Sequence, residues 1–219
     1  MRSAPAVPGP RRLAFDGHIA GFGTTEGTRV VVGRWLASPL GAFSDVMVER
    51  ADGTRLLLAP RTDVAELVQT TYAFDAVHVV PVSLRADEGR RRWSVRAGPL
   101  TADIGLGART PTGRLLAVVP RHPAVAPLVA TAVDPVARLL LDGVRTRGTA
   151  GQGRREWYTA TDQHAITAVR VLWGSQDLGQ LTPVEPPVRF GFSSVPAAPA
   201  VTRVRTTIEL SAGPPQHGH

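Results

Sequence analysis

The chain has 219 residues, enough for one domain with a sizeable core, and its 25 basic residues outnumber 18 acidic ones for a net charge of +7. It contains no cysteine, which excludes disulfides, thiolate metal sites, iron–sulfur clusters and a cysteine nucleophile. No run of residues approaches the roughly 20 apolar residues that span a bilayer, and the N-terminus lacks the apolar core of a signal peptide. We therefore expect a soluble, cytoplasmic protein with no membrane partner.

The positive charge does not by itself indicate a nucleic-acid partner. Every basic residue is Arg and none is Lys, as a GC-rich coding sequence would give. The arginines are scattered, and the densest cluster, Arg90-Arg91-Arg92, follows Asp87-Glu88-Gly89 as in a solvated hairpin turn. Aromatic residues make up 5% of the chain, few for base stacking. We expect no specific nucleic-acid partner.

The first part of the chain alternates strand and turn patterns. Residues 1–10 are predicted to be a disordered arm, residues 11–210 a single domain, and residues 211–219 a disordered tail. A loop is predicted at 21–27, and β-branched or alternating residues predict strands at 28–36, 43–50 and 54–59. Asp52-Gly53 is a strong hairpin signal. In the strand 43–50 each face carries a polar residue, so whichever face is buried contains one.

The stretch 62–82 is predicted to pass from a short helix into a buried strand. Asp63 with Glu66 is typical of an N-cap and its reciprocal partner, and Val64, Leu67 and Val68 share one helical face. The apolar run 77–82 then has the pattern of a strand. Such a junction brings side chains of two elements together, which suits a functional site but also describes a helix packed on a sheet.

The second part adds a hairpin and long strands. Residues 93–98 and 100–106 predict a hairpin around Gly98-Pro99, and 115–119 fits either a strand or a helix. Helices are predicted at 125–133 and from Pro135 to Leu141. Further strands are predicted at 155–161, 165–173, 188–192 and 200–210. Many strands and few short helices predict an α+β fold that is mainly antiparallel β, a closed or nearly closed barrel.

Few residues carry a recognisable chemical motif. The six histidines show no metal-ligand spacing, no serine-hydrolase elbow is present, and we expect no metal and no cofactor. The glycine-rich loop 148–153 before Arg154 fits a turn or an anion cradle. His78 fits a core or barrel-lining histidine. The polar residues that could face inward are Arg34, Asp45, Glu49, Arg155, Glu156 and Tyr158, which form either a site or a buried ion pair.

Two short motifs resemble those of the acetoacetate decarboxylase-like superfamily. In that family a helix leads to Trp-Gly-Tyr/Phe-Pro-Lys, and Tyr72-Ala73-Phe74-Asp75-Ala76 stands at the corresponding junction. Gly41-Ala42-Phe43-Ser44-Asp45 resembles the family's Gly-Pro-Tyr-x-Glu, with Asp in place of Glu. The resemblance covers most of the chain and implies a cone-shaped β-barrel with a central pocket.

The resemblance breaks at the residue that carries the family's chemistry. Ala76 stands where the family has its Schiff-base lysine, and an arginine elsewhere cannot replace it because its guanidinium stays protonated. The chain is therefore expected to be a divergent member that is not a Schiff-base decarboxylase, in which Asp45 could act as acid or base and Arg155 as an anion clamp.

These observations predict a small-molecule-binding protein or unusual enzyme whose ligand is an organic acid or carbonyl compound, with a homo-oligomer possible. The alternative is a non-catalytic interaction or oligomerisation domain. The candidate ligand-binding residues are Arg34, Asp45, Tyr72, Asp75, Ala76, His78, Arg155, Glu156 and Tyr158, and the candidate catalytic residue is Asp45.

Overall fold

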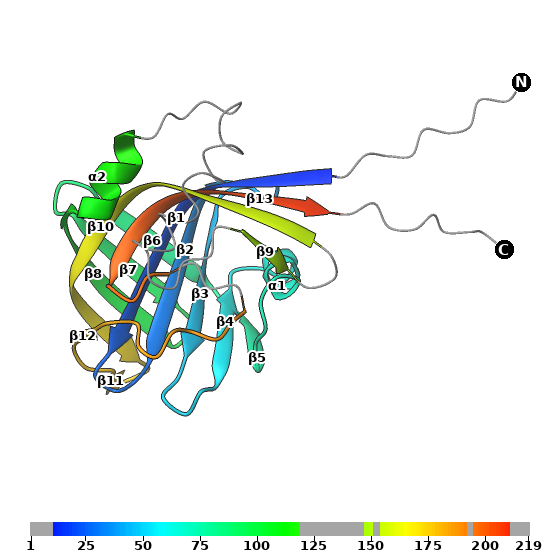
Figure 1. Ribbon diagram of the computed structural model, residues 1–219. Helices are drawn as coiled ribbons and strands as arrows, with labels where there is room; N and C mark the ends of the chain where they lie inside the picture. The colour runs from blue at the N-terminus through cyan, green and yellow to red at the C-terminus, as the bar shows by residue number, and fades with distance from the viewer. Residues whose placement is uncertain (1–10, 119–146, 151–153, 192–194, 211–219) are drawn as a thin grey trace, which may run out of the picture.

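One strongly curled β-sheet dominates the computed structural model, which describes residues 11–118, 147–150, 154–191 and 195–210 (Figure 1). Thirteen strands in this part of the chain join the sheet. Ten of them form a continuous path in the order β5-β4-β3-β2-β1-β13-β10-β8-β7-β6. All pairs on this path are antiparallel except β4 with β5. The prediction of a mainly antiparallel β fold with a few short helices is confirmed.

The strands on the path differ greatly in length. Their bounds are β1 (Arg11–Thr24), β2 (Arg29–Ala37), β3 (Phe43–Glu49), β4 (Arg55–Ala59), β5 (Ala76–Val79), β6 (Val82–Asp87), β7 (Arg92–Ala97), β8 (Leu100–Arg109), β10 (Arg154–Trp173) and β13 (Ala200–Leu210). Three short strands lie off the path: β9 (Arg147–Ala150) and β11 (Gln176–Asp177) pair with β10, and β12 (Leu181–Thr182) pairs with β1.

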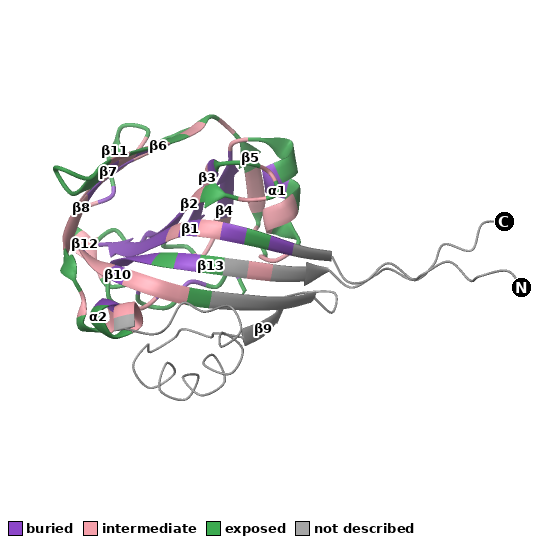
Figure 2. Ribbon diagram, turned by 90° about the horizontal axis from the view of Figure 1, so that it is seen from above, coloured by how far each residue is buried: buried purple, intermediate pink, exposed green. Residues whose placement is uncertain are grey.

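The sheet is strongly curled, and the strands at its two ends, β5 and β6, follow one another directly in the sequence. Seen from above, β6 and β7 face β2 and β3 across the interior (Figure 2). The end strands β5 and β6 are joined through Val80 and Pro81, yet no ladder pairs them among the described residues. The result is a curled half-barrel.

Two apolar cores lie on opposite faces of the sheet. The inner core fills the interior with residues from β1, β2, β3, β4, β7, β8, β10 and β13, such as Phe22, Val32 and Ile104, each 0% exposed. The outer core lies between the other face and a layer made of α1 (Thr62–Gln69), residues 184–191 and Val195. Because side chains alternate along a strand, neighbours such as Leu57 and Leu58 belong to different cores.

The helix α1 connects the one parallel pair of strands, β4 and β5, as a crossover requires. Val64 is buried, and Leu67 and Val68 pack on the outer core, as predicted. The predicted cap is wrong, because the helix begins at Thr62 and Arg61 occupies the N-cap position. Asp63 instead forms an ion pair with Arg61 at 3.1 Å.

Several predicted boundaries are also wrong. Residues 21–24 belong to β1 and not to a loop, and the predicted strands 155–161 and 165–173 are one strand, β10, interrupted by irregular pairing after Ala160. The ambiguous segment 115–119 lies largely in a second helix, α2 (Pro111–Val118). Residues 188–191 form only an isolated bridge between Tyr72 and Gly191. The helices predicted at 125–141 lie outside the described residues.

Candidate functional site

A row of polar side chains crosses the inner face of the sheet. Direct cross-strand pairing aligns Ser44 with Arg34, Arg34 with His18, His18 with Arg203, and Arg203 with Asp162. Residues opposite each other in an antiparallel pair project from the same face. We call Ser44, Arg34, His18, Arg203 and Asp162 the polar row.

The polar row lies at the edge of the inner core. Ala20 follows His18 by two residues in β1, and Val32 precedes Arg34 by two residues in the antiparallel strand β2. Ala20 and Val32 are both 0% exposed and belong to the inner core. Since residues two apart share a face, the row is directed into the curl of the sheet and not to its outer surface.

His18 is the most perturbed group of the row. Burial, together with the positive charges of Arg34 and Arg203, lowers the pKa of its imidazole to about 4, against the opposing effect of Asp16 and Asp162. Its Nδ1 atom is buried and has no hydrogen-bond partner in the described part of the chain. The ring is therefore uncharged at neutral pH and retains an unused hydrogen-bonding atom.

Trp93 of β7 reaches the polar row from the opposite wall. Its indole lies edge-on to His18, with 6.0 Å between ring centroids, and 5.7 Å from the guanidinium carbon of Arg34. A cation over an aromatic face within about 6 Å is attracted by the ring quadrupole. Trp93 is 4% exposed, so it holds Arg34 in place from a fixed position.

Arg34 has no other partner within the described residues. No hydrogen bond or ion pair joins its half-buried guanidinium to a described carboxylate. Its neighbours differ, because Arg203 contacts Asp16 at 3.2 Å and Asp162 contacts Arg109 at 2.8 Å. A guanidinium in this state is suited to receive an anion, with the neutral imidazole beside it as a hydrogen-bonding group.

A second histidine lies one row deeper. His164 is paired with Val201, and its Nδ1 lies 3.1 Å from Nη2 of Arg91, while its Nε2 lies 3.6 Å from Asp162. The backbone of Arg91 is in the left-handed region, with φ of 50°. That conformation is uncommon for a residue other than glycine, and here it turns Arg91 toward the inner face and His164.

Asp45, the predicted catalytic residue, lies on the other side of the sheet. It lies two residues from Phe43 and from Met47, so it shares the outer face of the sheet with these two core residues, and it is 3% exposed. Burial raises the pKa of its carboxyl to about 6, although the indole N–H of Trp35 donates a hydrogen bond to Oδ1 at 3.0 Å. Asp45 and Ala76 therefore belong to opposite faces, and the prediction of one shared interior is wrong for this pair.

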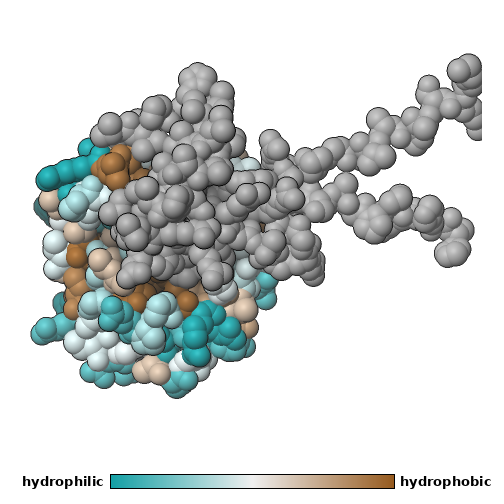
Figure 3. Space-filling model, viewed as in Figure 1, coloured by the Kyte–Doolittle hydropathy of each residue, from teal (hydrophilic) through white to brown (hydrophobic). Residues whose placement is uncertain are grey.

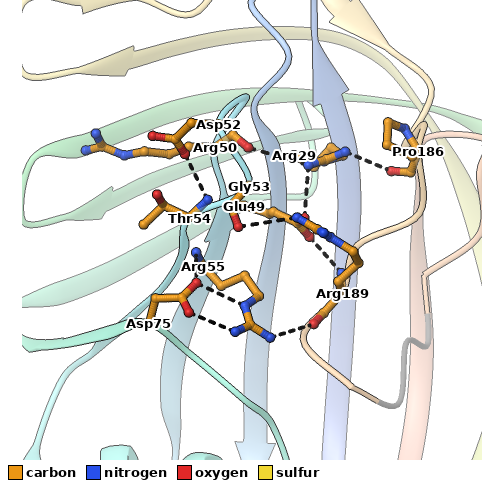
Figure 4. A network of polar contacts seen from close by, with 10 residues as sticks. All are labelled: Arg29, Glu49, Arg50, Asp52, Gly53, Thr54, Arg55, Asp75, Pro186 and Arg189. Carbon is orange, nitrogen blue, oxygen red and sulfur yellow. Dashed lines mark hydrogen bonds and ion pairs between the residues drawn. The ribbon is translucent and has the colours of Figure 1, made fainter.

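Glu49 is also on the outer face and forms the centre of a buried ionic network (Figure 4). Its carboxylate is fully buried and contacts Arg29 at 3.1 Å and Arg189 at 2.8 Å. Arg29 also donates to the carbonyl of Pro186 at 3.2 Å. These bonds fasten residues 186–189 to the sheet, so we interpret Glu49 as a structural residue. It corresponds to the buried ion pair that the sequence left as an alternative.

The predicted junction residues do not gather at one point. Asp75 is exposed and is paired in a two-pronged contact with Arg55, which holds the pKa of its carboxyl at about 2. Ala76 packs against the inner core, while Tyr72 packs against the outer core. His78 is exposed at the short end strand β5, so it is not a core histidine, although it pairs with Leu58 and shares the inner face with Ala76.

Arg155, Glu156 and Tyr158 are placed by the backbone of β10 only. They pair with Glu209, Ile208 and Thr206 of β13. Their side chains lie outside the described residues. Of the predicted candidates, Arg34 alone is placed in the polar row.

The sequence did not indicate His18, Trp93, Arg91, Arg203 or Asp162. His18 lies in β1, whose Gly17, Gly21 and Gly23 have the composition of a loop. The structure shows why glycine is needed there: a side chain at Gly17 would collide with the backbone of Arg34, and one at Gly21 would lie 2.7 Å from Val195. A usable signal was the alternation from Leu13 to Ile19, which has β-strand period.

The described residues contain no group of three or more His, Asp or Glu side chains that could hold a metal ion. Neither described helix is long and apolar enough to cross a membrane.

The comparisons with known proteins give little. No protein-family model matches the chain, and no curated protein matches it. Among solved structures, the chain is similar to the crystal structure of a "putative AttH" from Nitrosomonas europaea, with 12% sequence identity and a TM-score of 0.25. The match covers 98% of this chain and 60% of that one, so the chain spans less than two thirds of its length. A likeness at this level supports no conclusion about function.

Proposed function

We propose that this protein binds a small organic anion at the polar row. The observation that carries the proposal is the guanidinium of Arg34, which is half-buried, held over Trp93 and paired with no described carboxylate. A buried cation without a counter-charge is unfavourable, and an anionic ligand would remove that penalty. The unused Nδ1 of His18 gives the ligand a second polar contact beside the charge.

Binding is better supported than acid–base catalysis. A general acid or base works best when its pKa lies near the working pH. The pKa of His18 is lowered to about 4, so its ring has no proton to give as an imidazolium at neutral pH. Asp45, with its pKa raised to about 6, projects from the opposite face of the sheet and is remote from the row.

The proposal retains the resemblance to the acetoacetate decarboxylase-like superfamily as a hypothesis of distant origin. It is supported by the order of the α1 helix, the strand that follows it and the antiparallel strands of the curled sheet. Under this hypothesis the ligand is an organic acid or carbonyl compound held without an imine, because Ala76 replaces the lysine. We further propose a cytoplasmic location and no specific nucleic-acid or membrane partner.

The test is a thermal-shift screen of small organic acids and carbonyl compounds against the wild-type chain and two variants. Arg34→Gln should abolish or weaken binding by about tenfold to a hundredfold, the range for losing a hydrogen bond to a charged group. Arg96→Gln is the matched control, since Arg96 is exposed on β7 and outside the row. A hit that Arg34→Gln leaves unchanged would contradict the proposal.

The second candidate is an interaction or oligomerisation domain. It is favoured by the inner core, which fills much of the interior with buried side chains. The large exposed apolar residues in the described part are Leu36, Val79 and Leu115, which come from three separate elements. On the face shown in Figure 3, apolar and polar side chains of the described residues are interspersed. A concentration-dependent mass in light scattering, with no hit from the anion screen, would favour this candidate.

A further inference from the structure

Arginines outnumber carboxylates around the polar row. Asp16 contacts Arg203 at 3.2 Å and Arg205 at 3.4 Å. Asp162 contacts Arg109 at 2.8 Å. Both described carboxylates at the row are therefore already engaged by guanidinium groups, and neither is free to neutralise a further cation.

Two arginines at the row remain without a carboxylate partner in the described part of the chain. Arg34 contacts only the indole of Trp93. Arg91 donates to the backbone carbonyls of Leu106 and Gly107, and its Nη2 lies against the ring of His164. Arg91 is exposed, and these partners satisfy its N–H groups without supplying a negative charge.

Arg34 is a member of the polar row, and Arg91 is connected to the far end of the row through His164. Arg34 reaches the indole from β2 across the interior, and Arg91 lies in the turn before β7, where its guanidinium contacts the ring of His164. His164, the partner of Arg91, lies 3.6 Å from Asp162, which is a member of the polar row. The two guanidinium groups without a carboxylate partner thus lie at the two ends of one polar strip, which runs from Arg34 through the polar row and His164 to Arg91.

We propose that the ligand of this site is a dianion, with one negative group bound by Arg34 and the other by Arg91. This inference rests on the proposed function and narrows its ligand class. Two carboxylates, or the two charges of a phosphate ester, share this chemistry. A monoanion would engage only one of the two guanidinium groups, and the uncharged ring of His18 adds no third cation to the strip.

The experiment compares a dicarboxylate with its own monomethyl ester by titration calorimetry at neutral pH and low ionic strength. Malonate, succinate and glutarate vary the spacing of the two charges, and inorganic phosphate tests the phosphate alternative. The wild-type chain should bind the best-fitting dicarboxylate, or phosphate, at least about tenfold tighter than the matched monoester, the effect expected of one additional charge pair near a protein surface.

Variants separate the two ends of the strip. Arg91→Gln should reduce the affinity for the dianion to that for the monoester and leave the monoester unchanged, whereas Arg34→Gln should weaken both. Arg96→Gln should alter neither. Circular dichroism spectra and melting curves check that each variant is folded, and Arg91→Ala provides a second variant if Arg91→Gln is unstable.

Equal affinity for dicarboxylate and monoester in the wild-type chain would overturn the inference and leave the proposed function intact, provided that Arg34→Gln still abolishes binding. An equal loss of both ligands in Arg91→Gln would also overturn it, because Arg91 would then act on the site as a whole. If neither these compounds nor the wider screen gave a ligand dependent on Arg34, the proposed function would fail together with the inference.

Discussion

Replacing Asp45 by Asn tests how the outer face tolerates a buried carboxyl. Asp45 is 3% exposed, no arginine or histidine of the described residues pairs with it, and its one side-chain hydrogen-bond partner is Trp35. Burial raises the pKa from 3.8 to about 6. The folded chain therefore retains the carboxyl proton at pH values at which the unfolded chain has lost it.

The sign of the pH dependence follows from this difference. Below the unfolded pKa both states are protonated and Asp45 carries no penalty. As the pH rises from the pKa of the unfolded chain through that of the folded chain, the free energy of unfolding falls. A pKa difference of one unit corresponds to about 1.36 kcal/mol, so the full loss is about 3 kcal/mol, reached above about pH 7. Asparagine has nearly the same shape and does not ionise, so it escapes this loss.

We expect Asp45→Asn to gain free energy of unfolding relative to wild type as the pH rises, by about 2 kcal/mol between about pH 4.5 and pH 8. An amide N–H without an acceptor would lower the free energy of unfolding of Asp45→Asn equally at both pH values. The informative quantity is therefore the change in the mutational effect between the two pH values. Urea unfolding measures it, because urea carries no charge. Asp103→Asn is the control of opposite sign, since Ser94 holds the pKa of Asp103 below its usual value. Parallel pH profiles for wild type and Asp45→Asn would refute this reasoning.

Two further predictions concern the buried network and the missing lysine. Glu49→Gln should destabilise the fold by about 3–5 kcal/mol, because the substitution leaves Arg29 buried without a counter-charge, whereas Glu88→Gln in an exposed turn should change the free energy of unfolding by less than about 0.5 kcal/mol. A small effect of Glu49→Gln in urea unfolding would show that residues 186–189 are held by other contacts. Borohydride reduction in the presence of acetoacetate should leave the mass of the folded domain unchanged, since Ala76 has no amine, and a stoichiometric adduct within the domain would contradict this.

The local patterns of the sequence predicted where helices and strands occur better than they predicted which face of a strand lines the interior. The Asp52-Gly53 signal marks the hairpin between β3 and β4, and the helical spacing of Val64, Leu67 and Val68 identifies the buried side of α1. These features depend on neighbours in sequence. In contrast, the alternation of β3 predicts two faces, one with Asp45 and one with Ser44, without saying which one lines the interior.

The outer layer explains why the wrong face was chosen. Asp45 and Glu49 are buried beneath α1, residues 184–191 and Val195, a layer that forms only when distant parts of the chain meet. A strand covered on both faces buries polar residues of either set. The polar row was missed for a related reason, because its members come from β1, β2, β3, β10 and β13 and are aligned only by the register of the sheet.

The pairing of β1 with β13 affects how the sheet can fold, because it joins strands that lie far apart in the sequence. Starting at β6 and reading through β7, β8, β10 and β13 to β1, β2, β3, β4 and β5, the spatial path follows chain order except where β13 passes to β1. That one step joins Arg11 to Leu210, near the two ends of the described chain, and it spans more of the sequence than any other step, including the one from β8, which ends at Arg109, to β10, which begins at Arg154. Closing so long a loop carries the largest entropic penalty, and its contacts form only at the end of that search. Two locally assembled halves, β1–β5 and β6–β13, can therefore form before they join, and the polar row becomes complete only when β1 meets β13.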